Sequence, residues 1–236
     1  MCEGTPSLFL TRQNYRINVY QQLLKELNAH HVTLVAVSKM HPAQQILELY
    51  QKGQRVFGEN RAQELVEKSG ILPKDIQWHL IGHLQTNKVK SIASFVSMIE
   101  SVDSLRLLQE IDRQARLAGR VIDCLLQFHI AREETKFGLD ETEACALLEN
   151  PVYKAMTGIR ICGVMGMGTL TDDTAQVRSE FRRLKAIFLK LQTAFFADAP
   201  HFREISMGMS GDWQIAVEEG STMVRIGSLL FGARTY

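Results

Sequence analysis

The sequence predicts a single (β/α)8 barrel of the TIM type, with an extra helix before the first strand. Two observations favour this fold. Eight β-rich segments alternate with helix-like segments along the 236 residues, which is the order of a parallel sheet covered by its crossover helices. The length of the chain also fits one α/β barrel domain. An open, doubly wound sheet is the structural alternative.

The first elements form one helix, one strand and a second helix. Apolar residues recur on one helical face over residues 12–28, which predicts the extra N-terminal helix. An unbroken β-rich run over residues 33–39 indicates a buried parallel strand that ends on Lys39. Pro42 then suits a first helical position, and Gly53 suits a helix end.

The same alternation continues at similar spacing to the end of the chain. Further strands are predicted at residues 55–57, 77–81, 97–100, 121–129, 159–164, 204–206 and 223–226. Helices are predicted from residue 61, over residues 86–93 and over residues 174–196. No linker-like or low-complexity tract divides the chain, so we expect residues 1–236 to form one domain.

Composition and charge limit the function classes. With 45% hydrophobic and 22% charged residues, the chain resembles an ordinary globular protein with a large core. A net charge of +1 provides no broad positive surface, so we expect neither a nucleic-acid nor a membrane partner. The four cysteines show no metal-ligand spacing, and no segment has the apolar length of a membrane span. We therefore expect a cytoplasmic protein with reduced thiols and no metal site.

Lys39 is the first candidate functional residue, because it stands where the first strand leaves the core. Strand ends carry the chemistry of α/β barrels, and a lysine held against apolar walls can attack an aldehyde as the free amine. The alternative is a lysine at a strand tip that is ion-paired or extends into solvent, which is the commoner situation.

Two features near the end of the chain narrow the chemistry. Ser210, Gly227 and Ser228 follow the last two strands, where barrels often bind phosphate through backbone N–H groups. Arg225 interrupts an apolar strand and needs a partner, either a structural carboxylate or the ring nitrogen of a cofactor. A reactive lysine, a phosphate site and a partner for a ring nitrogen are what pyridoxal phosphate requires.

Several motifs in matching order resemble the pyridoxal phosphate homeostasis protein family. They are VSK at 37–39, FGEN at 57–60, WHLIGHLQ at 78–85, SMGMSGD at 206–212, STMVRIG at 221–227 and FGARTY at 231–236. The resemblance implies a barrel like the N-terminal domain of alanine racemase, with pyridoxal 5'-phosphate as its cofactor. The chain differs from the family pattern at Met40, His41, His129 and Gly166.

The resemblance also implies the cofactor-binding residues. Lys39 would hold pyridoxal phosphate as an aldimine, and Arg225 would face the pyridine nitrogen. The phosphate would lie among Ser210, Gly227 and Ser228. Beside the ring would lie Asn60 and Met165. Lys136 matches a lysine that recurs in the family, although a solvated loop charge is the favoured interpretation.

The function implied is binding of pyridoxal phosphate and its supply within the cell, with amino acids or apoenzymes as acceptors. An arginine beside the ring nitrogen disfavours its protonation and weakens the cofactor as an electron sink, so no catalytic residue is assigned. We expect a monomer, because the chain lacks the second domain through which racemases pair.

Two enzymatic alternatives remain open. One is an amino-acid racemase of weak or specialised activity, with Lys39 as the base and His83 or Tyr236 as the acid. The other is a cofactor-free aldolase in which Lys39 attacks a sugar phosphate directly.

Overall fold

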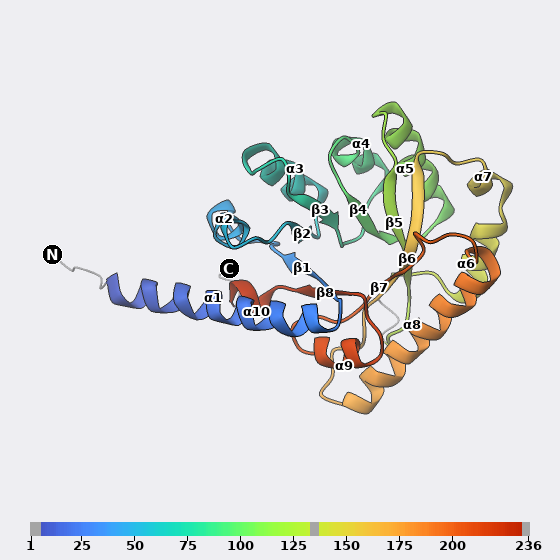
Figure 1. Cartoon of the computed structure of the whole chain (residues 1–236). Helices are drawn as coiled ribbons and strands as arrows, with labels where there is room; N and C mark the ends of the chain where they lie inside the picture. The colour runs from blue at the N-terminus through green and yellow to red at the C-terminus, as the bar shows by residue number, and fades with distance from the viewer. Residues whose placement is uncertain (1–5, 133–136, 233–236) are drawn as a thin grey trace.

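The computed structural model describes residues 6–132 and 137–232, with side chains described from residue 17 onward. Its eight parallel strands follow one another around a closed barrel, and the last strand pairs with the first. Figure 1 shows the helices arranged outside these strands. The predicted (β/α)8 fold is therefore confirmed, and the open sheet is excluded.

The strands are short and begin close to their predicted positions. They are β1 (Thr33–Val37), β2 (Val56–Glu59), β3 (Gln77–Leu80), β4 (Met98–Val102), β5 (Ile122–Phe128), β6 (Ile159–Gly166), β7 (Glu204–Ser206) and β8 (Met223–Ile226). The first strand is two residues shorter than predicted, because a turn begins at Ser38 and places Lys39 beyond the strand.

The helices cover the outside of the barrel. They are α1 (Pro6–Ala29), α2 (Ala43–Gln51), α3 (Ala62–Ile71), the 3-10 turn η1 (Thr86–Lys88), α4 (Val89–Ile92), α5 (Leu105–Leu117), α6 (Glu141–Glu149), α7 (Pro151–Lys154), α8 (Thr174–Phe195), α9 (Trp213–Glu218) and α10 (Ser228–Phe231). The N-terminal helix starts earlier than predicted, and it packs beside α10 and β1 (Figure 1). No helix in the described part of the chain is long and apolar enough to cross a membrane.

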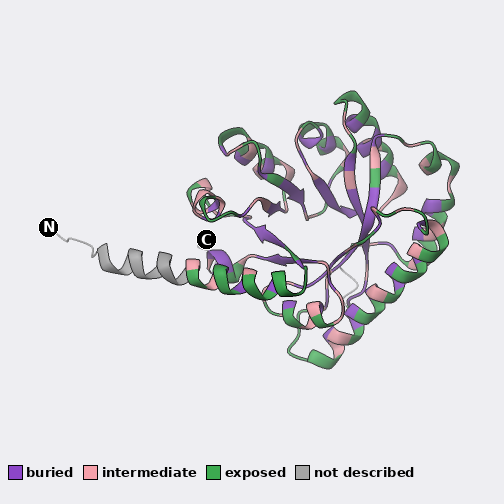
Figure 2. Cartoon of the chain, in the orientation of Figure 1, coloured by how far each residue is buried: buried purple, intermediate pink, exposed green. Residues whose placement is uncertain are grey.

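The core has two layers, because side chains alternate between the two sides of each strand. The outer layer fills the space between strands and helices, and Figure 2 shows the buried residues on the strands and the inward helix faces. The inner layer fills the barrel with Val35, Met98, Leu125, Cys162, Met165 and Met223. Close packing requires glycine at Gly163, where φ is +154° and a Cβ would lie 1.8 Å from the carbonyl oxygen of Glu204.

Candidate functional site

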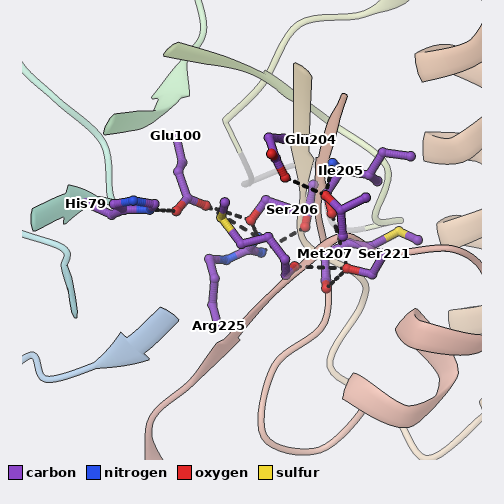
Figure 3. Close-up of polar contacts among 11 residues, drawn as sticks. His79, Glu100, Glu204, Ile205, Ser206, Met207, Ser221 and Arg225 are labelled. Carbon is purple, nitrogen blue, oxygen red and sulfur yellow. Dashed lines mark hydrogen bonds and ion pairs between the residues drawn. The ribbon is translucent and has the colours of Figure 1, made fainter. Parts of the chain in front are cut away.

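Four buried polar side chains form a hydrogen-bonded chain across the inside of the barrel (Figure 3). Nδ1 of His79 on β3 lies 2.7 Å from Oε1 of Glu100 on β4. The hydroxyl of Ser206 on β7 donates to Oε2 of Glu100 at 2.6 Å, and Nη1 of Arg225 on β8 donates to that hydroxyl at 2.5 Å. None of the four is more than 5% exposed. The chain of hydrogen bonds therefore links the consecutive strands β3 and β4 to the consecutive strands β7 and β8, and Glu100 and Ser206 are 106 residues apart in sequence.

Glu100 stays ionised at the centre of this chain. Burial raises the pKa of Glu100, but the hydrogen bond from His79 and the charge of Arg225 outweigh burial and hold that pKa below its ordinary value. Because a carboxylate only accepts hydrogen bonds, Nδ1 of His79 carries the proton that they share.

Arg225 is held in one orientation by partners at both of its terminal nitrogens. Its Nη2 donates to the carbonyl oxygen of Gly166 at 2.9 Å, and its Nη1 lies 3.9 Å from Oε2 of Glu100. Burial lowers the pKa of Arg225, and the charge of Glu100 opposes that effect. The carboxylate that the sequence left open as a partner for Arg225 is thus Glu100, with Ser206 between the two.

Lys39 lies in a tight turn directly after β1 and is half-buried. The amide of His41 donates to the carbonyl oxygen of Ser38 at 3.0 Å, which makes Lys39 and Met40 the two central residues of the turn. Met40 has φ +64°, a left-handed conformation that usually requires glycine at this turn position. The candidate lysine is therefore presented by a strained turn.

A second polar cluster, made of Ser38, Glu59, Glu64 and Lys68, lies beneath this turn. The Lys68 ammonium on α3 donates to the carbonyl oxygen of Ser38, to Oε1 of Glu59 and to Oε1 of Glu64, each at 2.7 Å. The Ser38 hydroxyl donates to Oε1 of Glu59 at 2.6 Å, and the Met40 amide donates to Oε1 of Glu64 at 2.6 Å. Side chains of β2 and α3 thus hold both neighbours of Lys39.

Glu59 differs from Glu100 in its electrostatics. Burial raises the pKa of Glu59 to about 7, although the charge and hydrogen bond of Lys68 and the hydroxyl of Ser38 favour the carboxylate. Its Oε2 atom is buried without a hydrogen-bond partner among the described residues. Glu59 therefore gains or loses a proton near neutral pH, close to the Lys39 turn.

The predicted phosphate residues come together at the end of β8. The backbone N–H of Gly227 donates to the hydroxyl of Ser210 at 3.3 Å, and Ser228 is the first residue of α10. A Cβ at Gly227 would lie 3.1 Å from the carbonyl oxygen of Val37, two residues before Lys39. The lysine turn and the predicted phosphate loops are thus neighbours, as the pairing of β1 with β8 requires.

The two predicted ring neighbours lie in different surroundings. Asn60 follows β2, and its Oδ1 atom is buried without a hydrogen-bond partner in the described part of the protein. It borders a cavity of about 290 Å³ between the loops after β2 and β3, lined by Asn60, Arg61, Ala62, Gln63, His83, Leu84, Gln85 and Lys88. Met165 is fully buried in the inner layer, one residue before the carbonyl that binds Arg225.

Of the two candidate acids of the racemase alternative, His83 lies in the described part of the protein. His83 is exposed, with Nδ1 3.3 Å from Oδ2 of Asp103 and its ring stacked on Phe137 at 4.4 Å. Tyr236 and Lys136 lie outside the described residues.

The sequence did not identify five polar residues of the site, which are Glu59, Glu64, Lys68, Glu100 and Ser206. Their partners lie on other elements, so no local pattern identifies them. The spacing of Glu64 and Lys68 was the one available signal, because residues four apart on a helix can pair. Such pairs are common on exposed helix faces and point to no site by themselves.

Comparison with known proteins identifies relatives over nearly the whole chain. The family described as alanine racemase, N-terminal domain, matches residues 13–235. A pyridoxal phosphate homeostasis protein of Aquifex aeolicus is 39% identical, covering 86% of this chain and 87% of the relative. The human pyridoxal phosphate homeostasis protein is 37% identical, covering 90% of this chain and 80% of the relative.

A solved structure agrees with these relatives. The structure of PipY from Synechococcus elongatus with PLP bound is 39% identical in sequence and superposes with a TM-score of 0.76, covering 86% of this chain and 93% of PipY. Sequence and fold thus point to the same relatives. The chain therefore belongs to the pyridoxal phosphate homeostasis protein family, whose barrel is that of the alanine racemase N-terminal domain.

Proposed function

We propose that this protein binds pyridoxal 5'-phosphate covalently through Lys39 and takes part in its intracellular homeostasis and supply. The observation that carries the proposal is the meeting of β1 and β8. This pairing puts the Lys39 turn beside the Gly227 and Ser210 loops and above the buried Arg225. The PLP-bound structure of PipY, a relative with the same fold, supports the same ligand.

The residues present fit this cofactor. Gly227 packs against the Val37 carbonyl oxygen, where a Cβ would lie 3.1 Å away, so its backbone is close to the Lys39 turn. Its N–H, which donates to the Ser210 hydroxyl, and that hydroxyl are donors of the kind that bind a phosphate. The Oδ1 atom of Asn60 is a buried acceptor that no described residue satisfies. Arg225 is a permanently charged side chain whose N–H groups only donate, which suits a partner of an unprotonated ring nitrogen.

Each residue has a distinct role in the proposal. Pyridoxal phosphate supplies an aldehyde, whose carbon forms a C=N bond to a neutral primary amine with loss of water. Lys39 would provide that amine, and Arg225 would face the ring nitrogen. The residues that would hold the phosphate are Ser210, Gly227 and Ser228. Asn60 and Met165 would lie beside the ring.

The charge state of Arg225 favours a carrier over an enzyme. Glu100 and Ser206 hold the guanidinium in place, and a permanent cation beside the ring nitrogen disfavours the protonation that makes the cofactor a strong electron sink. We propose that amino acids or apoenzymes remove the cofactor by supplying a competing amine, and that the protein works as a monomer in the cytoplasm.

The first test compares the wild type with Lys39→Ala and with Lys90→Ala, a control that removes an exposed lysine of α4. Pyridoxal phosphate is added, the visible absorption spectrum is recorded, and the adduct is fixed with borohydride for peptide mass mapping. We expect a bound-cofactor band and a label on the Lys39 peptide in the wild type and the control, and neither in Lys39→Ala. A label spread over surface lysines would contradict the assignment.

The racemase alternative has its own test. Cofactor-loaded protein is mixed with a single enantiomer of an amino acid, and optical activity is followed over many equivalents of substrate. A carrier leaves the enantiomer unchanged, whereas sustained racemisation would show that the protein is an enzyme.

A further inference from the structure

We propose that Glu64 and Lys68 of α3 are positioning residues that hold the strained Lys39 turn in the conformation that presents the lysine amine to an aldehyde. This proposal rests on the proposed function of Lys39. The contacts that carry it lie in the protein alone and can be tested without any cofactor.

The turn needs an external restraint because of Met40. A non-glycine residue with φ +64° is disfavoured by contact between its Cβ and its own backbone. Such conformations persist only where surrounding contacts determine them, and they gather at functional sites. The strained residue here is the immediate neighbour of Lys39.

The restraint acts on both sides of the lysine. On one side, the Ser38 carbonyl oxygen accepts from the Lys68 ammonium at 2.7 Å in addition to the turn's own hydrogen bond from His41. On the other side, the amide of the strained Met40 donates to the Glu64 carboxylate at 2.6 Å. Hydrogen bonds to charged groups are stronger than neutral ones. Lys39 is thus the one turn residue between two charge-assisted contacts from α3.

The two restraining side chains are coupled to each other. The Lys68 ammonium lies 2.7 Å from Oε1 of Glu64 and 2.7 Å from Oε1 of Glu59, and the Lys68 side chain is only 9% exposed. If Glu64 and Lys68 served only to neutralise the buried Glu59, they would need no contact with the Ser38 carbonyl or the Met40 amide. These additional backbone contacts are what assign α3 a positioning role.

Glu64→Ala is the primary test, because Glu64 is partly exposed and its loss leaves the buried Glu59–Lys68 pair intact. Glu67→Ala is the matched control, since it removes an exposed carboxylate from the same helix. Hydrogen–deuterium exchange of the Met40 amide, resolved by NMR, reports on the turn directly. Loss of one charge-assisted hydrogen bond should speed this exchange about tenfold in Glu64→Ala only.

Two chemical readouts then connect the turn to the lysine. Reductive methylation of Lys39 by formaldehyde and cyanoborohydride measures how the amine is presented, without any cofactor. The rate at which pyridoxal phosphate labels Lys39 measures presentation to the proposed ligand. Both rates should fall several-fold in Glu64→Ala and stay at the wild-type level in Glu67→Ala. A change in methylation without any cofactor labelling in the wild type would support positioning while contradicting the proposed function.

Met40→Gly provides the rescue experiment. Glycine adopts a positive φ without strain, so the turn should form without Glu64. In the Glu64→Ala background, Met40→Gly should restore part of the lost methylation rate. If the second change restores nothing, or if Glu64→Ala leaves both the Met40 exchange and the Lys39 methylation unchanged, the positioning role is wrong.

Discussion

Two fully buried carboxylates of the strands, Glu100 and Glu59, lie in opposite electrostatic environments. Glu100 has a hydrogen-bond donor at each oxygen and a pKa below its ordinary value, whereas Glu59 has one buried oxygen without a partner among the described residues and a pKa of about 7. The first carboxylate is a fixed charge that orients Arg225. The second can change its charge near neutral pH, beside the turn that carries Lys39.

In the proposed function, this difference divides two tasks within one barrel. A ring-nitrogen partner must keep one charge and one orientation, and the polar chain of His79, Glu100, Ser206 and Arg225 provides both. A lysine that takes up and releases an aldehyde needs surroundings that can change. The cluster of Ser38, Glu59, Glu64 and Lys68 combines a strained turn with a titratable carboxylate.

The largest effect should come from removing the fixed charge. Glu100→Ala leaves the buried Arg225 without its carboxylate, and loss of one partner of a buried pair costs about 3–5 kcal/mol of the free energy of unfolding. Urea unfolding of this variant and of Glu110→Ala, which removes a carboxylate from the outer helix α5, measures the difference. A loss as small as that of the control would mean that the chain of four does not hold Arg225.

The next prediction concerns the pH dependence of stability, in which Glu59 and Glu100 should act in opposite directions. Because folding raises the pKa of Glu59 from 4.5 to about 7, the folded protein binds this proton more tightly than the unfolded chain. The proton on Glu59 therefore stabilises the folded state fully below pH 4.5, and this stabilisation is lost as the pH rises to about 7. At about 1.4 kcal/mol per pKa unit, the loss is roughly 3 kcal/mol of the free energy of unfolding. Glu100, whose pKa is lowered, contributes in the opposite sense and loses its contribution as the pH falls.

The measurement is urea unfolding of the wild type, Glu59→Gln and the exposed control Glu67→Gln between pH 5 and pH 8, a range set by the raised pKa. The wild type and the control should lose stability relative to Glu59→Gln as the pH rises. Parallel pH profiles for all three proteins would show that Glu59 does not titrate in this range.

The smallest effect on stability should come from removing the Ser206 hydroxyl, which lies between Arg225 and Glu100. Ser206→Ala removes the bridge between Arg225 and Glu100 but leaves both ions in place, so we expect a loss of about 1–2 kcal/mol in the free energy of unfolding. Ser94→Ala, which alters an exposed serine, is the control for urea unfolding. A loss equal to that of Glu100→Ala would show that the hydroxyl, and not the ion pair, holds Arg225.

The order of strands and helices could be predicted from local sequence. Each strand is a short run of β-forming residues, and apolar residues recur at helical spacing along each helix. One strand boundary was wrong because a charged residue is buried. The strand predicted to end at Glu100 continues to Val102, because Glu100 points into the barrel and is paired there. A carboxylate at the end of an apolar run usually marks the surface, and only its partners on β3 and β7 reverse that expectation.

The candidate site was predictable where a residue type conflicts with its local pattern. Lys39 and Arg225 stand out as charges in or beside apolar strands. Lys68 does not, because a lysine four residues after a glutamate is typical of an exposed helix face, and its burial depends on the turn after a different strand. Contacts between distant elements therefore account for what the sequence could not show.

The pairing of β8 with β1 has a consequence for biosynthesis. A ribosome releases Lys39 early, yet Arg225 and Gly227 emerge almost two hundred residues later, and the first strand has an open edge until the last strand docks on it. A nascent chain halted before Met223 therefore contains Lys39 and Ser210 but neither Arg225 nor Gly227. Under the proposed function, capture of the aldehyde ligand would then require that β8 has been made and has closed the barrel on β1.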